Sequence, residues 1–406
     1  MESNSLSPEP SSITNILTLR YNPSITPNLP RKTWKNFKHL IEKPSIEFIE
    51  KSIANTIRKQ LDSSSVKKTC IALSGGIDST LILALMKKTL PDIQVDAVSI
   101  KFANSIDETE PASKIAAKLG ADHHVIYVEN YLRELPKAIS IIKLPFWDLH
   151  WYYVVKKSQS LSKHLASGDG GDELFGGYTF RYKKFLSLIN TNFTPLEKVR
   201  AYLSCHERDQ VPDQEKLFGK RAKFSWESIN KSLIVHFDNT LSPLEQVFLA
   251  DYNGKLLYNF NPINTKILNH FDMNSISPLL SEDMISYALS IPLQYKYDQT
   301  ENMGKLLLRK LLSKYNMDKL TTNEKLGFNV NTLNLWKSFG QSLCEEYLTD
   351  AQVVKDGWIN KDWISEYIHK GDLDVRYVNK FLGLLAFEIW YRLFITKDMS
   401  ANTTLN

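Results

Sequence analysis

The stretch "IALSGGIDSTLILALM", residues 71–86, begins with apolar and β-branched residues, bends at two glycines and continues with apolar residues at helical spacing. This order predicts a buried strand, a tight turn and a helix, which together form the first unit of a parallel sheet. In open parallel sheets, ligands bind beyond the carboxyl ends of the strands, where the loops meet the N-termini of the following helices. The glycine bend is therefore the first place to expect a bound ligand.

Composition narrows the classes of protein that this chain can belong to. The 406 residues are 43% hydrophobic, 11% aromatic and 23% charged, which is typical of a soluble globular chain of about two domains. The net charge of +5 is spread along the chain, so it indicates no nucleic-acid partner. Three scattered cysteines without a C-x-x-C pair indicate a reducing compartment, and we expect a cytoplasmic location. The apolar run that begins at Phe381 is too short to span a bilayer and contains Glu388 and Arg392, so it predicts a buried C-terminal helix and no membrane partner.

Three segments are expected along the chain. Residues 1–43 are rich in Ser, Pro and Asn without a sustained period, and we interpret them as a leader or linker in which residues 18–34 are extended and turn-filled. Residues 44–178 alternate between strand and helix patterns, which predicts an α/β fold with a doubly wound parallel sheet and right-handed crossovers. Residues 179–406 are predicted to be mostly helical. The expected strands are 69–74, 94–100, 123–128 and 164–167. The expected helices are 44–61, a helix from the glycine bend to residue 88, 108–120, 131–142 and 149–163.

The first glycine turn, residues 74–80, has the composition of a phosphate site. Its glycines allow close backbone approach, the hydroxyls of Ser74, Ser79 and Thr80 add donors, and the helix N-terminus attracts negative charge. It lacks both the lysine of G-x-x-x-x-G-K-[ST] and the pattern G-x-G-x-x-G. A carboxylate here would repel a phosphate unless a cation lay between them, so Asp78 is predicted to bind Mg²⁺. The alternative role of Asp78 is to cap the helix.

A second turn, "SGDGGDELFGGY" at residues 167–178, holds three carboxylates and five glycines. It follows a short strand and precedes a helix, so it is expected at the same edge of the sheet as the first turn. Asp172 is predicted as a second Mg²⁺ ligand, and Asp169 as a base or orienting carboxylate beside the reacting group. The alternative is an ordinary surface turn rich in Asp and Gly.

The pairing of SGGIDST with SGDGGDELFGGY resembles the synthetase domain of asparagine synthetase B, in the PP-loop ATP pyrophosphatase superfamily, whose fold is adenine nucleotide alpha hydrolase-like. Further segments extend the resemblance to roughly residues 45–395: KLGADHHVIYV, SPLLSEDMISYALSIP, GKLLLRKLL, NEKLGFNV and LLAFEIWYRLF. The first motif alone would also fit GMP synthetases and tRNA-modifying enzymes. The second motif, SGDGGDELFGGY, reduces the number of families in this superfamily that the sequence fits.

Roles for individual residues follow from this resemblance. It implies that Asp169 lies beside an acyl-adenylate, that Lys325 meets the departing pyrophosphate, and that Lys305 and Arg309 support the site. It also implies Mg²⁺ at Asp78 and Asp172. The residues implied to bind ATP, through its phosphates or through backbone contacts with adenine, are Leu73, Ser74, Gly75, Gly76, Asp78, Ser79, Ser99, Ile100, Ser167 and Gly168.

The implied reaction is AMP-forming amide synthesis with ATP and Mg²⁺, and aspartate with ammonia is the default substrate pair. The alternatives are an amide synthetase for another carboxylate or amine, a tRNA-modifying pyrophosphatase, and a catalytically silent regulatory or scaffold protein. A separate glutaminase and a homo-oligomer are the expected candidates for protein partners.

Several residues also have ordinary structural interpretations. Taken alone, Lys325 would be an ordinary surface lysine. His123 and His124 are expected to be structural, and the aromatic cluster at 147–154 is expected to pack a helix.

Two departures from the family pattern stand out. Family members usually have a Glu-x-Arg pair where this chain has Asn274 and Ile276, which puts the local packing and the acceptor pocket in question. The complete enzyme also begins with a glutaminase and a catalytic cysteine, whereas here Glu2 follows Met1. Little more than about sixty residues precede the first predicted strand, and TLRYNPSITPNL resembles only the tail of a glutaminase.

Overall fold

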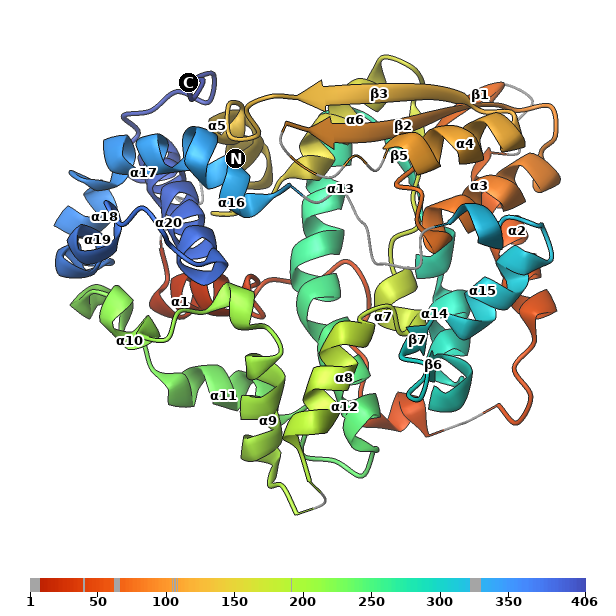
Figure 1. Ribbon diagram of the computed structural model, residues 1–406, viewed down its shortest axis with the longest axis horizontal. Coiled ribbons are helices and arrows are strands. Elements are labelled where there is room, and N and C mark those ends of the chain that lie inside the picture. The colour runs from red at the N-terminus through yellow and green to blue at the C-terminus, as the bar shows by residue number, and fades with distance from the viewer. Residues whose placement is uncertain are drawn as a thin grey trace.

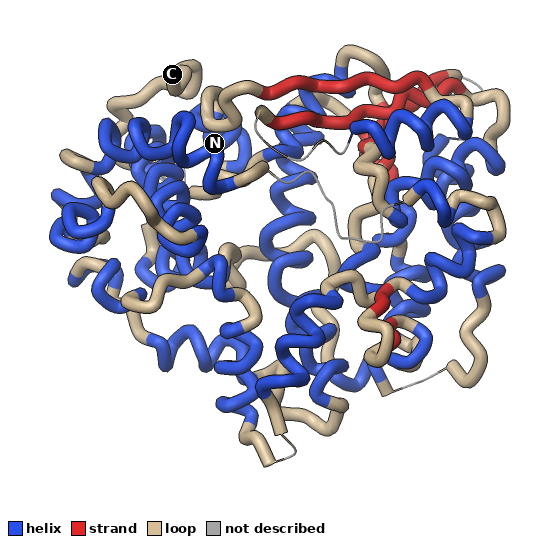
Figure 2. The backbone as a smooth tube through the Cα atoms, viewed as in Figure 1, coloured by secondary structure: helices blue, strands red, loops and turns tan. Residues whose placement is uncertain are grey.

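A parallel sheet of five strands forms the centre of the structure, a computed structural model that describes residues 8–38, 41–61, 66–103, 105, 107, 109–190, 192–321 and 330–406. The order is β3-β2-β1-β4-β5, and every neighbouring pair is parallel. Figure 1 shows the sheet at one end of the molecule, and Figure 2 shows its strands in red. The strands are β1 (Lys68–Ala72), β2 (Gln94–Phe102), β3 (Asp122–Val128), β4 (His164–Ala166) and β5 (Asn274–Ile276).

Helices cover both faces of this sheet, as the alternating pattern predicted. Successive strand residues enter opposite cores: Ile71 and Val95 join one apolar cluster, while Cys70 and Val98 join the other. The first cluster includes residues of α2 (Ile46–Leu61), α3 (Ile77–Thr89) and α4 (Thr109–Leu119). The second includes residues of α5 (Leu135–Ile142) and α6 (His150–Gln159). The doubly wound α/β fold is therefore confirmed.

The rest of the described chain is mostly helical, as expected. Its remaining α-helices are α1 (Pro10–Leu19), α7 (Gly171–Phe175), α8 (Thr179–Leu188), α9 (Pro195–Ser204), α10 (Gln214–Leu217), α11 (Trp226–Ile234), α12 (Pro243–Asp251), α13 (Asn261–His270), α14 (Glu282–Leu289), α15 (Leu306–Ser313), α16 (Thr332–Leu335), α17 (Gln341–Leu348), α18 (Gln352–Lys355), α19 (Lys361–Tyr367) and α20 (Val375–Phe394). Two π-helical segments, η4 (Tyr252–Phe260) and η8 (Trp336–Gly340), continue neighbouring helices, and β6 (Tyr297–Asp298) pairs with β7 (Met303–Gly304). Short 3₁₀ helices are η1 (Trp34–Phe37), η2 (Glu207–Asp209), η3 (Lys220–Ala222), η5 (Pro278–Leu280), η6 (Leu293–Tyr295) and η7 (Asp318–Leu320).

The predicted C-terminal helix is α20, and it is buried along most of its length. Its Glu388 accepts the backbone N–H groups of Gln352 at 3.1 Å and Val353 at 3.0 Å, which supplies partners for the first turn of α18. Among the helices of the described residues, none is both long enough and apolar enough to cross a membrane.

The fifth strand was not predicted. Residues 274–276 pair in parallel with β4, with Ala166 opposite Ile276. A strand of three residues is too short to show an alternating pattern, and it lies within a helical region. Asn274 and Ile276, the two positions expected to depart from the family pattern, therefore belong to an edge strand of the sheet.

Residues 10–19, which lie within the segment interpreted as a leader or linker, form the buried helix α1. Every residue from Ile13 to Leu19 is buried, and α1 packs against α20 (Figure 1). Because all residues from Ile13 to Leu19 are buried, this part of the helix has no exposed polar face. The turn-filled character expected for the following residues is confirmed up to Thr33. The domain boundaries at 43 and 178 stay a prediction.

Replacing Leu17 with alanine tests whether α1 is part of the fold. Leu17 is 5% exposed and faces Gly383 of α20, so we expect the variant to lose about 2–5 kcal/mol in the free energy of unfolding. Urea denaturation measures this loss, and Ser11→Ala, at the exposed N-terminal end of α1, is the matched control. Equal stability of the two variants would show that the packing of α1 adds nothing measurable to the stability of the fold.

The topology brings the two glycine turns together. The chain runs outward from β1 to β2 and β3 and then crosses to β4, which pairs with the other side of β1. The strand order therefore reverses between β1 and β4, which is where ligands bind in open α/β sheets. The first turn follows β1 and the second follows β4, so both lie at this switch point.

Candidate active site

The first glycine turn joins the end of β1 to α3. The Thr80 hydroxyl donates to the Gly76 carbonyl at 2.7 Å within the first turn of the helix. The hydroxyl oxygens of Ser74 and Ser79 lie 3.3 Å apart, and the Ser74 N–H donates to the Ser79 hydroxyl at 3.3 Å. These polar groups gather at the N-terminus of a 13-residue helix, where the helix dipole favours an anion.

The second glycine turn is held in place by β5. The Ser167 N–H donates to the Ile276 carbonyl at 3.0 Å, and the Ser167 and Ser277 hydroxyl oxygens lie 3.2 Å apart. The missed strand therefore fixes the backbone from which Gly168 and Asp169 extend. It lies at the edge of the site, beside predicted nucleotide-binding residues.

The two turns touch each other, and glycines make the contact possible. A Cβ atom placed on Gly168 would lie 2.6 Å from the Asp78 Cβ and 2.8 Å from the Ser79 backbone nitrogen. A Cβ atom on Gly171 would lie 2.3 Å from the Asp78 carboxyl carbon. The Asp78 side chain thus rests directly on the backbone of the second turn.

A lysine from a third segment bridges the two predicted metal ligands. The Lys305 Nζ lies 2.5 Å from the Asp78 Oδ2 and 2.7 Å from the Asp172 Oδ1, and the three side chains are only 13–21% exposed. Lys305 immediately precedes α15 and has a left-handed backbone with φ of 58°. Its N–H donates to the Phe175 carbonyl at 3.0 Å, which ties it to the end of α7.

Electrostatics keep this lysine charged. Burial by itself lowers the pKa of Lys305, but the carboxylates of Asp172 and Asp78 outweigh burial and raise the pKa above its ordinary value. Lys305 was expected only to support the site, because the leucine-rich sequence around it contains no motif that marks a binding or catalytic residue. Its contact with Asp78 joins residues that are 227 positions apart in the sequence.

Arg309 lies one helical turn after Lys305 and faces the same region. Its Nε donates to the Gly304 carbonyl at 2.9 Å. Burial lowers the pKa of Arg309 and the Asp78 carboxylate opposes that shift. Two cationic side chains of one segment therefore lie near the two turns, which suits a polyanionic ligand.

Asp169 extends from the second turn toward α13. The Asn264 side-chain amide donates to the Asp169 Oδ2 at 3.1 Å. Burial raises the pKa of Asp169, while hydrogen bonds from Ser167 and Asn264 oppose that rise. Asn264 is a site residue that the sequence analysis missed, since a single asparagine within a helix has no motif around it.

The positions predicted to contact adenine lie at the carboxyl ends of β1 and β2. The Leu73 N–H donates to the Val98 carbonyl at 2.9 Å, and the Leu73 carbonyl accepts the Ser99 hydroxyl at 2.6 Å. Ile100 is the next residue of β2. The Ser99 Oγ also lies 2.8 Å from the His123 Nε2, so His123 has a structural partner, as expected.

The structure thus gathers most of the predicted site at one edge of the sheet. Lys325 lies outside the described residues, and its role stays a prediction. The predicted residues found on the two turns, or at the ends of β1 and β2, are Leu73, Ser74, Gly75, Gly76, Asp78, Ser79, Ile100, Ser167, Gly168, Asp169 and Asp172.

The carboxylate pair suits a magnesium ion that arrives with a nucleotide. Both carboxylates contact one cationic nitrogen, so one metal ion could contact both after a small shift. In the described part of the chain, no group of three or more His, Cys, Asp or Glu residues could hold a metal. Magnesium bound by one or two carboxylates together with phosphates and water needs no such group. The donor set therefore fits the predicted Mg²⁺.

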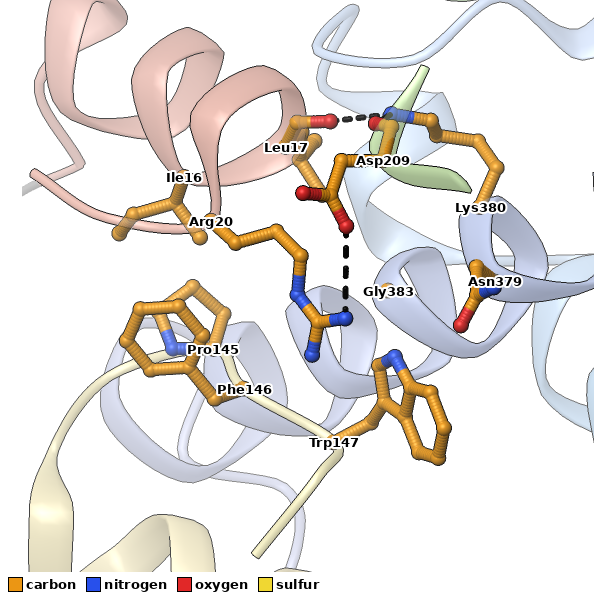
Figure 3. A pocket seen from close by; sticks show the side chains of 10 residues that line it. All are labelled: Ile16, Leu17, Arg20, Pro145, Phe146, Trp147, Asp209, Asn379, Lys380 and Gly383. Carbon is orange, nitrogen blue, oxygen red and sulfur yellow. Dashed lines mark hydrogen bonds and ion pairs between the residues drawn. The ribbon is translucent and has the colours of Figure 1, made fainter. Parts of the chain in front are cut away.

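A cavity of about 30 Å³ lies away from the two turns, between α1 and α20. In Figure 3 its polar wall contains Arg20, which forms an ion pair with Asp209, and Lys380, which donates to the Leu17 carbonyl. None of its ten lining residues was predicted to belong to the site. Its small volume, and the partners that Arg20 and Lys380 already have, assign it to the packing of α1.

Comparison with known proteins gives a family match over most of the chain. The family model described as asparagine synthase matches residues 49–392. Asparagine synthetase [glutamine-hydrolyzing] 1 of Bacillus subtilis is 29% identical over 368 residues, which cover 80% of this chain and 56% of that protein. A putative asparagine synthetase of Methanocaldococcus jannaschii is 36% identical over 112 residues, which cover 26% of this chain and 22% of that protein. The chain thus spans at most about half the length of these curated relatives.

Solved structures with a partial likeness include two synthetases. NMN synthetase from Francisella tularensis has a TM-score of 0.27 at 14% identity and is matched over 57% of this chain and 94% of that chain. NH3-dependent NAD synthetase from Campylobacter jejuni has a TM-score of 0.27 at 16% identity and is matched over 49% of this chain and 99% of that chain.

Proposed function

Because this chain belongs to the asparagine synthase family, we propose that it catalyses ATP-dependent, AMP-forming amide synthesis. The observation that carries the proposal is the meeting of the two glycine turns, where Asp78 and Asp172 converge on one cationic position. This arrangement suits a reaction whose main requirement is to neutralise and position a triphosphate. A bound Mg²⁺ would neutralise phosphate charge as pyrophosphate departs.

Two successive displacements make up the proposed reaction. A carboxylate oxygen of the substrate attacks the α-phosphate of ATP, and the bond to pyrophosphate breaks. An amine nitrogen then attacks the activated carbonyl carbon, AMP leaves with its oxygen, and the amine loses a proton. The mixed anhydride of the carboxylate and AMP, which forms in the first displacement, is reactive enough for the second step once it is kept from water.

The described residues have different roles in the proposed reaction. The first turn, with Ser74 and Ser79, binds phosphate oxygens at the N-terminus of α3. Lys305 supplies a positive charge beside the phosphates. Asp169, held by Asn264, orients the amine or accepts its proton, and burial raises its pKa, which makes the carboxylate a better proton acceptor. Lys325 remains the candidate for contact with pyrophosphate.

Aspartate and ammonia are the substrates that we propose first. The relative from Bacillus subtilis is named a glutamine-hydrolysing asparagine synthetase, and this supports aspartate as the carboxylate. The positions of Asn274 and Ile276 in β5 are the main departure near the acceptor side, so another carboxylate is the alternative to test. The three cysteines are free, which agrees with the cytoplasmic location that we propose.

Glutamine hydrolysis is not expected from these 406 residues alone. It requires an activated nucleophile, usually a thiolate in this family. All three cysteines are buried, and burial raises the pKa of Cys70 to about 12, that of Cys205 to about 11 and that of Cys344 well above its ordinary value. Ammonia would therefore come from solution or from a separate glutaminase.

The assay is release of AMP and pyrophosphate from ATP and Mg²⁺ with a panel of carboxylates. With aspartate and ammonium we expect both products in equal amounts with asparagine, and with glutamine in place of ammonium we expect little or no asparagine. Release with a different carboxylate would identify the alternative substrate. Release that depends on tRNA alone would contradict the proposed function.

A further inference from the structure

Lys305 lies where the predicted metal ion would bind. Its Nζ lies within 2.7 Å of an oxygen of each carboxylate, and Mg²⁺ would contact the same oxygens at about 2.1 Å. The ammonium group and a metal ion cannot both occupy the space between Asp78 and Asp172. In the absence of nucleotide, the lysine already balances part of the charge of the pair.

The backbone around Lys305 holds its side chain in this position. The left-handed backbone conformation at φ of 58° is strained for a lysine. The hydrogen bond from the Lys305 N–H to the Phe175 carbonyl holds the backbone in this conformation. Gly177 provides space for the side chain: a Cβ atom there would lie 2.6 Å from the Lys305 Cε and 1.7 Å from the Asp172 Oδ1. By contrast, Lys310 in the middle of α15 is exposed to solvent.

We propose that Lys305 is a resident counter-cation that keeps the carboxylate pair closed to free divalent metal ions until a nucleotide binds. The triphosphate brings additional negative oxygens, toward which the flexible ammonium group can turn. The carboxylates are then available to a metal ion that is also held by phosphate. Binding of the metal and binding of ATP are thereby coupled, and a metal ion without nucleotide gains little from the site. This inference rests on the proposed function, because it assumes that the two turns bind ATP with Mg²⁺.

Mn²⁺ binding followed by electron paramagnetic resonance tests this coupling without any turnover. In the nucleotide-free protein, we expect Lys305→Met to bind Mn²⁺ at least about ten-fold more tightly than the wild type, because the carboxylate pair has lost its competing cation. The same variant carrying Asp78→Asn should lose this gain. Lys310→Met, in the same helix, is the matched control and should bind Mn²⁺ like the wild type. With α,β-methylene ATP added, the wild type should bind Mn²⁺ at least about ten-fold more tightly than without it.

Equal Mn²⁺ affinity of the wild type and Lys305→Met without nucleotide would overturn the proposal, as would tight Mn²⁺ binding by the wild type alone. If Lys305→Met does not fold, Lys305→Gln replaces it in the same titrations, and equal Mn²⁺ affinity of Lys305→Gln and the wild type without nucleotide would overturn the proposal. Failure of the proposed function would appear elsewhere, as the absence of carboxylate-dependent pyrophosphate release. The two failures are therefore distinguishable.

Discussion

Replacing Asp78 or Asp172 with asparagine is expected to lower carboxylate-dependent pyrophosphate release by about three orders of magnitude or more. Each substitution removes one of the two carboxylates that converge on the cationic position, while it keeps the size of the side chain. Loss of a single preorganised electrostatic contact in an active site costs about 10²–10³ in rate, and loss of a metal ligand also weakens binding of the metal. Turnover measured across a range of Mg²⁺ concentrations checks this expectation.

The fold should survive both substitutions, because each variant leaves Lys305 one carboxylate partner and removes no apolar volume. Thermal melts of Asp78→Asn and Asp172→Asn should therefore lie close to the wild-type curve. Asp92→Asn, in the exposed turn between α3 and β2, is the matched control and should leave turnover unchanged. Wild-type turnover of either site variant at limiting Mg²⁺ would show that the metal assignment is wrong.

The second large effect is expected from Gly168→Ala. The added Cβ would lie 2.8 Å from the Ser79 nitrogen and 2.9 Å from the Asp78 carbonyl carbon, and these are backbone atoms that no side-chain rotation can move away. The two turns must therefore separate by several tenths of an ångström or more. Since a displacement of about 1 Å at a reacting centre can lower a rate about 10²-fold, we expect a loss of this order in kcat and weaker binding of ATP.

Steady-state kinetics with ATP as the varied substrate, together with circular dichroism melts, measure both effects. Gly371→Ala is the control, because a Cβ at Gly371 meets nothing within 4 Å. If Gly168→Ala kept its kcat and its KM for ATP within about two-fold of the wild type, the close contact between the turns would not be needed for the reaction.

Regular patterns made a large part of the fold predictable from the sequence. Four of the five strands and the helices between them have clear periods, and the glycine turns interrupt these periods at the places where the structure turns. The helix α20 was predictable because its apolar run is long and contains few charges. Knowledge that strands end at a common edge was enough to place Asp78 and Asp172 together.

The missed parts depend on contacts between distant segments. The three residues of β5 become a strand only because β4 offers an unpaired edge, and α1 is helical in a place where it can be buried on all sides. Asn264, which was not predicted, reaches the site through the packing of α13. Lys305 was expected only to support the site, and its contacts with Asp78 and Asp172 depend on the packing of α15. These features form through tertiary contacts, and the periodicity of a single sequence does not indicate such contacts.

The docking of α1 against α20 has a consequence for synthesis of the chain on the ribosome. The carbonyl of Leu17 accepts a hydrogen bond from Lys380, so this contact joins the first part of the chain to the last. Ribosomes add about 5–20 residues per second, so α1 emerges tens of seconds before its partner exists. During that interval, the apolar surface of the nascent helix has to remain in water, be covered by a chaperone, or rest on a temporary neighbour.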